Sequence, residues 1–216
     1  MISIIVFFMR CKLKVCGVTQ ATDAVRLAAL GVDAIGVNFW KGSKRYIDPH
    51  DAKPFLNEIK GSILRVGVFV DEEISRVKEI YEEGLIDVAQ LHGNEDRSYH
   101  EELVESGINL IQVIRVMKED TEIKKPTYGA SKILLDSHVS GYGGAGESFD
   151  WNLARKFIIA NPESEVILAG GITPENIAQA AAIKPAMIDV ASGAETSPGI
   201  KDFILIGKML DSLKNM

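Results

Sequence analysis

Cysteine is scarce in this chain, whose 216 residues include only Cys11 and Cys16. If the segment between them is extended, their Cα atoms lie roughly 16 Å apart at about 3.3 Å per residue, whereas a disulfide needs about 7 Å or less. We therefore expect two free thiols, which fits a reducing cytosol. Neither cysteine has metal-ligand spacing with a histidine, so the sequence does not indicate a zinc site.

Positive charge is also in short supply. The chain has 24 Lys and Arg residues against 30 Asp and Glu, for a formal net charge of −6. Without a basic excess, we do not expect binding to nucleic acid. An anionic substrate would have to be attracted by local groups against the overall field.

The apolar start of the chain, MISIIVFF (1–8), lacks a basic region before it and is too short for a signal peptide or a membrane span. We expect residues 1–10 to form an N-terminal extension, either frayed or upstream of a true start at Met9. A single domain is expected over residues 11–216, with no membrane association.

Apolar strand-like runs alternate with helix-like segments along the chain. The predicted strands are 13–17, 33–39, 63–70, 87–92, 109–116, 132–136, 165–170 and 187–192. The predicted helices are 20–30, 49–59, 72–83, 95–106, 150–160, 174–182 and 200–213, and only the connection over 118–125 lacks a helical pattern. Eight such repeats predict an α/β protein, a single-domain (β/α)₈ TIM barrel. A doubly wound open sheet is the alternative, although no GxGxxG pattern follows the first strand.

Short polar residues mark several predicted helix starts. Thr19, Asp71 and Asp150 each precede a helical pattern, and Thr173 reads as an N-cap followed by Pro174 at the first helical position. These signals support the alternation of strands and helices.

In a (β/α)₈ barrel, active groups lie where strands end. Cys16 ends the first strand just before a predicted helix, whose N-terminus can lower a thiol pKa from about 8.5 and favour a thiolate; a small buried hydrophobe is the other interpretation. Asp136 ends the sixth strand, where apolar neighbours would raise its pKa toward that of a proton donor, unless the carboxylate is structural.

Other candidates follow the remaining strands. Residues 137–149 contain four glycines and form either a plain surface loop or a lid. The turns AGG (169–171) and ASG (191–193) follow the last two strands, where such barrels bind phosphate. Arg45 can hold a substrate carboxylate through its planar fork. Gln90 and His92 alternate along the fourth strand and are expected to point into the barrel.

Nine short motifs follow one another along the chain. They are KVCGVT (14–19), SKRYI (43–47), RVGVFV (65–70), QLHG (90–93), LLD (134–136), GGAGESFDW (143–151), LAGGITPEN (168–176), DVASGAE (189–195) and PGIKD (198–202). Across about residues 12–213 the chain thereby resembles the phosphoribosylanthranilate isomerase family of tryptophan biosynthesis.

The resemblance implies an Amadori rearrangement of N-(5-phosphoribosyl)anthranilate to 1-(2-carboxyphenylamino)-1-deoxyribulose 5-phosphate, without cofactor or metal. It implies that Cys16 is the general base and Asp136 the general acid, and that Arg45 binds the anthranilate carboxylate. It further implies that the backbones of Gly170, Gly171, Ser192 and Gly193 bind the phosphate. It also implies that Asp189 bonds sugar hydroxyls and that Gln90 and His92 contact the substrate. A phosphosugar is the expected small-molecule partner, and a cytoplasmic monomer or homodimer the expected form.

The chain departs from the family pattern in two loops and one strand. Lys41-Gly42 replaces a Pro-Lys pair, Asn38 replaces an apolar residue, and Ala145 replaces the threonine of a Gly-Thr-Gly. These changes affect loop conformation and affinity rather than reaction type, because no catalytic group is lost.

Other functions remain as alternatives. A non-catalytic phosphate-ligand-binding barrel would not need both Cys16 and Asp136. A sibling aminoaldose isomerase of histidine biosynthesis would be expected to carry an aspartate where Cys16 ends the first strand. A redox sensor would need a second cysteine at CxxC spacing, which the chain lacks.

Overall fold

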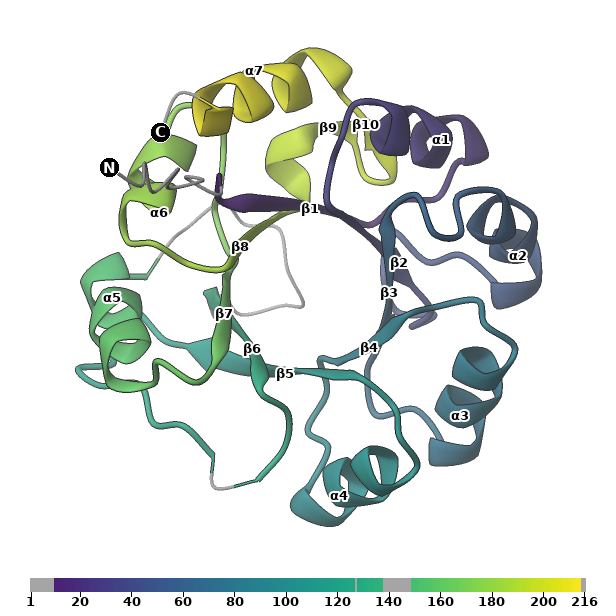
Figure 1. Ribbon diagram of the computed structural model, residues 1–216, viewed down its shortest axis with the longest axis horizontal. Coiled ribbons are helices and arrows are strands. Elements are labelled where there is room, and N and C mark those ends of the chain that lie inside the picture. Colours follow the sequence, from purple (N-terminus) through teal and green to yellow (C-terminus); the bar gives the residue numbers. More distant parts are fainter. Residues whose placement is uncertain (1–9, 127, 138–148, 215–216) are drawn as a thin grey trace, which may run out of the picture.

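A computed structural model describes residues 10–126, 128–137 and 149–214. Eight parallel strands close into a barrel in the order of the sequence, and the helices surround it (Figure 1). The strands are β1 (Lys12–Cys16), β2 (Ala34–Asn38), β3 (Leu64–Phe69), β4 (Val88–Leu91), β5 (Leu110–Val116), β6 (Lys132–Ser137), β7 (Glu165–Leu168) and β8 (Met187–Val190). The (β/α)₈ prediction is confirmed, and the open sheet is wrong because β1 pairs with β8 as well as with β2.

Among the described residues, seven helices cover the outside of the barrel (Figure 1). They are α1 (Ala21–Ala29), α2 (Pro49–Glu58), α3 (Ile74–Glu82), α4 (Arg97–Glu105), α5 (Trp151–Ala160), α6 (Ile177–Ala182) and α7 (Phe203–Lys214). Each overlaps a predicted helix, and residues 118–125 contain none, as expected. In the part of the chain that the structure describes, no helix combines the length and the apolar character needed to cross a membrane.

Of the predicted helix N-caps, one is confirmed and three are wrong. Asp150 caps α5 by accepting a hydrogen bond from the backbone of Asn152. Thr19 and Asp71 do not cap, because α1 and α3 begin later, after Gln20 and Glu73. Thr173 and Pro174 belong to a turn that precedes α6, whose N-cap is Asn176. The Asn176 side chain is bonded to the turn itself, accepting from the Thr173 amide at 2.8 Å.

A small hairpin before α7 was not predicted. A short 3₁₀ turn, η1 (Ser192–Ala194), leads into two antiparallel strands, β9 (Glu195–Ser197) and β10 (Ile200–Lys201). The prediction that the last helix begins at residue 200 is therefore wrong by three residues. The hairpin lies beside the end of β1 in Figure 1, and Lys201 donates to the carbonyl of Cys16.

The core has two parts, because both faces of a parallel barrel are covered. A small cluster fills the barrel: Ala34, Val66, Val88, Ile111, Leu134, Ile167, Ala169 and Met187. A larger cluster packs the strands against the helices. The two thiols, Cys11 and Cys16, are free as predicted. The expected extension up to residue 10 and the possible lid fall mostly on residues 1–9 and 138–148, which lie outside the described residues.

Arg65 is a charged side chain inside this packing, with only 1% of its surface exposed. Its Nη2 lies 2.6 Å from Asp87 Oδ1, and Nη1 donates to the carbonyls of Leu56 and Gly84. One guanidinium thus ties β3 to the ends of α2 and α3 and to the start of β4. It lies at the start of β3, away from the strand ends where barrels place their chemistry, so its role is stability.

Replacing Arg65 with methionine is expected to lower the free energy of unfolding by roughly 2–4 kcal/mol, because Asp87 and two buried carbonyls lose their partner. Urea denaturation measures this loss. The control Lys78→Met breaks a surface ion pair with Glu102 and is expected to lower it by less than about 1 kcal/mol. Equal losses in the two variants would contradict the assignment.

Candidate active site

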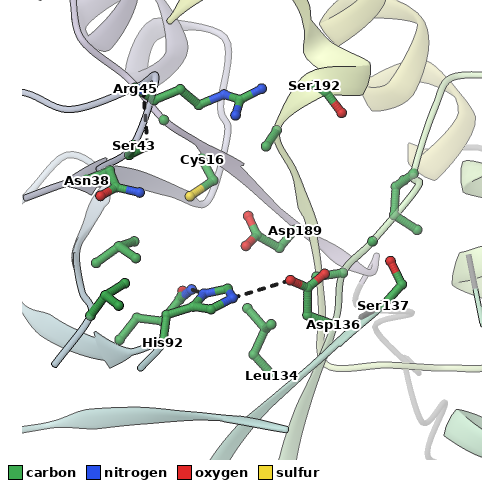
Figure 2. A pocket seen from close by; sticks show the side chains of 18 of the residues that line it. Cys16, Asn38, Ser43, Arg45, His92, Leu134, Asp136, Ser137, Asp189 and Ser192 are labelled. Atoms are coloured by element: carbon green, nitrogen blue, oxygen red, sulfur yellow. Dashed lines mark hydrogen bonds and ion pairs between the residues drawn. The ribbon is translucent and has the colours of Figure 1, made fainter. Parts of the chain in front are cut away.

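A cavity of about 140 Å³ lies at the carboxyl ends of the barrel strands. Nine of the ten predicted site residues line it: Cys16, Arg45, Gln90, His92, Asp136, Gly170, Gly171, Asp189 and Ser192. Gly193 does not line it but follows Ser192 in η1. Figure 2 shows the side chains of Cys16, Asp136 and Asp189 converging on the same space. The barrel therefore brings together the two groups predicted to carry the chemistry.

Lys14 lies beneath Cys16 on the same face of β1, since alternate residues of a strand share a face. Its fully buried Nζ lies 2.8 Å from Asp189 Oδ2 on β8, and its charge acts on the Cys16 thiol. Burial lowers the pKa of Lys14, but the Asp189 carboxylate and Cys16 together more than offset this effect and leave the pKa raised. An ammonium ion is thus fixed beside the thiol.

The thiol of Cys16 does not have the lowered pKa that a helix N-terminus would give. Burial raises its pKa, the ammonium of Lys14 opposes this, Asp189 adds to it, and Lys201 also opposes it. The prediction was wrong because α1 begins only at Ala21, so its N-terminus is not what acts on the thiol. Burial thus disfavours the thiolate of Cys16, and the ammonium of Lys14 is the strongest of the influences that favour it.

Asp136 is linked to the other polar residues of the barrel interior. His92 Nε2 lies 3.3 Å from Asp136 Oδ2, and Gln90 Nε2 lies 3.1 Å from His92 Nδ1. With the Gln90 amide donating, His92 Nδ1 accepts, and its Nε2 carries the proton directed at Asp136 (Figure 2). Gln90 and His92 are thus engaged with the predicted acid as well as lining the cavity.

Asp189 has one oxygen in use and one without a partner. Oδ2 accepts from Lys14, whereas Oδ1 is buried and has no hydrogen-bond partner within the described ranges 10–126, 128–137 and 149–214. A buried acceptor of this kind is costly unless it is paired. Because Asp189 lines the cavity, a ligand hydroxyl there can supply the missing donor.

The two predicted phosphate turns lie against each other. Gly170 and Gly171 have φ angles of 86° and 66°, a left-handed conformation that favours glycine. A side chain at Gly193 would collide with the carbonyl of Ile172, so the turn after β8 packs directly on the turn after β7. Asn176 also donates to the carbonyl of Gly171 at 2.8 Å. This arrangement leaves backbone at the cavity wall, where it can approach an anion.

Arg45 is held by residues that the sequence reasoning did not single out. Its Nε and Nη2 contact the carboxylate of Glu195, at 2.9 and 2.7 Å from Oε2. Burial lowers the pKa of Arg45, but the hydrogen bond with Glu195, the charge of that carboxylate and Cys16 together leave the pKa raised. The Nζ of Lys201 lies 2.6 Å from Glu195 Oε1. Gly17 leaves the space that the stem of Arg45 occupies.

Lys14, Glu195 and Lys201 are charged residues beside the site that the sequence reasoning missed. All three stand inside the motifs that carried the resemblance, KVCGVT, DVASGAE and PGIKD. A charged residue within an otherwise apolar or glycine-rich motif is the signal that could have found them. Among the described residues, no group of three or more His, Cys, Asp or Glu side chains is arranged to hold a metal ion.

Comparison with known proteins assigns the chain to a family. Residues 13–212 match the family described as N-(5'phosphoribosyl)anthranilate (PRA) isomerase. The chain belongs to the PRA isomerase family. The PRA isomerase of Thermotoga neapolitana is 34% identical over 206 residues, covering 95% of this chain and 99% of that protein.

Solved structures of PRA isomerases share the fold. The enzyme from Thermus thermophilus superposes with a TM-score of 0.83 at 33% identity, covering 94% of this chain and 98% of that one. A PRA isomerase in complex with reduced 1-(o-carboxyphenylamino)-1-deoxyribulose 5-phosphate gives a TM-score of 0.76 at 28% identity, covering 95% of this chain and 100% of that one.

In this member of the PRA isomerase family, alkylation tests how the charges around Cys16 affect the pKa of its thiol. In a Cys11→Ser background, iodoacetamide should modify Cys16 slowly at pH 7 and faster as pH rises past about 8.5, the usual thiol pKa, because burial raises the pKa of Cys16. Lys14→Met should shift this dependence to higher pH, since it removes the ammonium.

The matched control is Lys12→Met, which removes an exposed lysine of the same strand and should leave the dependence unchanged. If the paired carboxylate of Asp189 prevents Lys14→Met from folding, the double variant Lys14→Met/Asp189→Asn removes both charges. A rate–pH curve that is identical in the wild type and in a folded variant lacking Lys14 would contradict the electrostatic role.

Proposed function

We propose that the protein isomerises N-(5'-phosphoribosyl)anthranilate to 1-(2-carboxyphenylamino)-1-deoxyribulose 5-phosphate, a step of tryptophan biosynthesis. The observation that carries the proposal is the convergence of Cys16 and Asp136 on one cavity that also has an arginine and two glycine turns in its wall. These groups match the needs of a substrate with a carboxylate at one end and a phosphate at the other.

Asp136 is proposed as the general acid that protonates the furanose ring oxygen, which opens the ring to a Schiff base. The contact with His92 supports this role, because the imidazole Nε2 lies 3.3 Å from Asp136 Oδ2 and orients the carboxyl group. Gln90 in turn fixes the tautomer of His92. We therefore assign Gln90 and His92 to positioning Asp136 as well as lining the substrate's cavity.

Cys16 is proposed as the base that removes the proton from C2 of the Schiff base. The cationic nitrogen next to that carbon makes the proton acidic, so a modest base suffices. The ammonium of Lys14 stabilises the thiolate form that does this work. The resulting enolamine tautomerises to the ketone. The substrate and the product have the same atoms, so the reaction is an isomerisation.

The remaining groups would hold the substrate. Arg45 is assigned to the anthranilate carboxylate, and the backbones of Gly170, Gly171, Ser192 and Gly193 to the phosphate. The unpartnered Oδ1 of Asp189 supports the assignment of this residue to a sugar hydroxyl. We also propose that residues 11–216 act as one catalytic domain, in a cytoplasmic monomer or homodimer.

Genetic rescue tests the function directly. The gene should restore growth of a bacterial strain that lacks this isomerase on medium without tryptophan. Failure by a folded, well-expressed protein would favour a non-catalytic binding barrel. Rescue of a strain lacking the aminoaldose isomerase of histidine biosynthesis, without rescue of the first, would favour that sibling activity.

Removing either proposed proton-transfer group should slow turnover without abolishing binding. Cys16→Ser and Asp136→Asn are each expected to lower kcat by about 10²–10⁴-fold, the usual contribution of a general acid or base. Steady-state kinetics and calorimetric titration with the reduced product analogue measure turnover and binding separately. Near-normal turnover in Cys16→Ser would remove the assignment of the base.

Removing the proposed carboxylate anchor should weaken substrate binding at one end only. Arg45→Ala is expected to raise KM by about 10–100-fold, which corresponds to losing a charge-assisted hydrogen bond, while the inhibition constant of inorganic phosphate stays nearly unchanged. The exposed neighbour Lys44 provides the control, Lys44→Ala. An equal loss of phosphate affinity in Arg45→Ala would place Arg45 at the other end of the substrate.

A further inference from the structure

One edge of the Arg45 guanidinium is already occupied by a buried carboxylate. Glu195, 3% exposed in its side chain, accepts from Nε at 2.9 Å and from Nη2 at 2.7 Å. An arginine has five N–H donors in a fixed fork, so the pair of donors between Nη1 and Nη2 is left for a ligand. Glu195 therefore determines which edge of Arg45 a substrate carboxylate can meet.

The same carboxylate would cancel the charge of Arg45 if it stood alone. Lys201, whose side chain is fully buried, places Nζ 2.6 Å from Glu195 Oε1 and 2.5 Å from the carbonyl oxygen of Cys16. Burial raises the pKa of Glu195, but Arg45 and Lys201 outweigh this and hold it below its usual value. Taken by themselves, the side chains of Arg45, Lys201 and Glu195 carry a charge of +1, in a chain whose formal net charge is −6.

Lys201 also joins this cluster to the strand that carries Cys16. Its backbone amide donates to Asp23 on α1 at 3.1 Å, and the Gly199 amide donates to Glu195 at 3.1 Å. The hairpin β9–β10 is thereby fixed to β1 and α1. A displacement of Glu195 or Lys201 would therefore shift both the Arg45 guanidinium and the backbone of Cys16.

On the basis of the proposed function, we propose that Glu195 and Lys201 are positioning residues for the carboxylate anchor. Glu195 orients the free edge of Arg45 toward the substrate carboxylate, and Lys201 supplies the surplus positive charge that makes the oriented arginine attractive to an anion. Orientation and attraction are thus divided between two residues, and they can be separated by experiment.

Charge counting gives a specific order of KM values for the substrate N-(5'-phosphoribosyl)anthranilate. Lys201→Met leaves a local charge of zero and should raise KM about tenfold, with kcat within about threefold of the wild type. Glu195→Gln leaves +2 and should not raise KM, but should lower kcat about tenfold, because Arg45 is no longer oriented. The double variant returns to +1, so its KM should lie within about threefold of the wild type while kcat stays low.

Damage to the structure alone would not produce this order, because a second substitution in a damaged hairpin would not restore KM. Lys201→Arg keeps the charge and should keep KM. Lys208→Met and Glu58→Gln, at exposed positions, control for loss of a lysine or a glutamate. If Lys201→Met does not fold, the comparison of Glu195→Gln with the double variant decides, since KM should be higher in the double variant, which carries one positive charge less.

Two results would overturn the proposal. One is a double variant whose KM stays as high as that of Lys201→Met, and the other is an equal rise of KM in both single variants. Absence of turnover in the wild type would instead contradict the proposed function. Calorimetric titration with anthranilate then tests the same order in dissociation constants, and an order other than the one derived from charge would overturn the inference.

Discussion

A single buried ion pair joins the first strand of the barrel to the last. Lys14 and Asp189 are opposite each other in the register of β1 and β8, and their charged atoms lie 2.8 Å apart. Losing one partner of such a pair leaves an uncompensated charge in the interior, at a cost of roughly 3–5 kcal/mol. Because the same ammonium lies beside Cys16 and the same carboxylate faces the cavity, closure of the barrel and chemistry at its mouth depend on one contact.

On the proposed function, the site binds an anion without a strongly positive surface. Each buried cation has a carboxylate beside it, Lys14 with Asp189, and Arg45 and Lys201 with Glu195. This pairing makes burial of the cations affordable in a low-dielectric interior, and only a small positive excess remains for the substrate. Two glycine turns, which carry no charge of their own, provide the second anchor. The protein can therefore stay acidic overall and still select a ligand with two anionic ends.

The sequence was informative where function follows from position along a strand. Cys16, Asp136 and the two glycine turns were placed correctly because the ends of parallel strands meet at one rim. Local signals were less reliable. Thr173 was predicted as the N-cap of α6, but the N-cap is Asn176, whose side chain accepts a hydrogen bond from the Thr173 amide. The raised pKa of Cys16 and the roles of Glu195 and Lys201 depend on burial and on a hairpin with no periodic pattern. Such properties arise from contacts between distant segments, which spacing along the chain does not encode.

Gly17 has a consequence for how this active site can change over evolutionary time. It directly follows Cys16, and it leaves the space that the Arg45 stem fills. Any side chain at this position would collide with the Arg45 stem and would strain the backbone next to the thiol, because its φ angle of 78° suits glycine. Adaptation to a new substrate is therefore blocked at the residue nearest the thiol. Other parts of the cavity wall remain open to substitution, among them Asn38 at the end of β2 and Trp40 and Ser43 in the loop that follows.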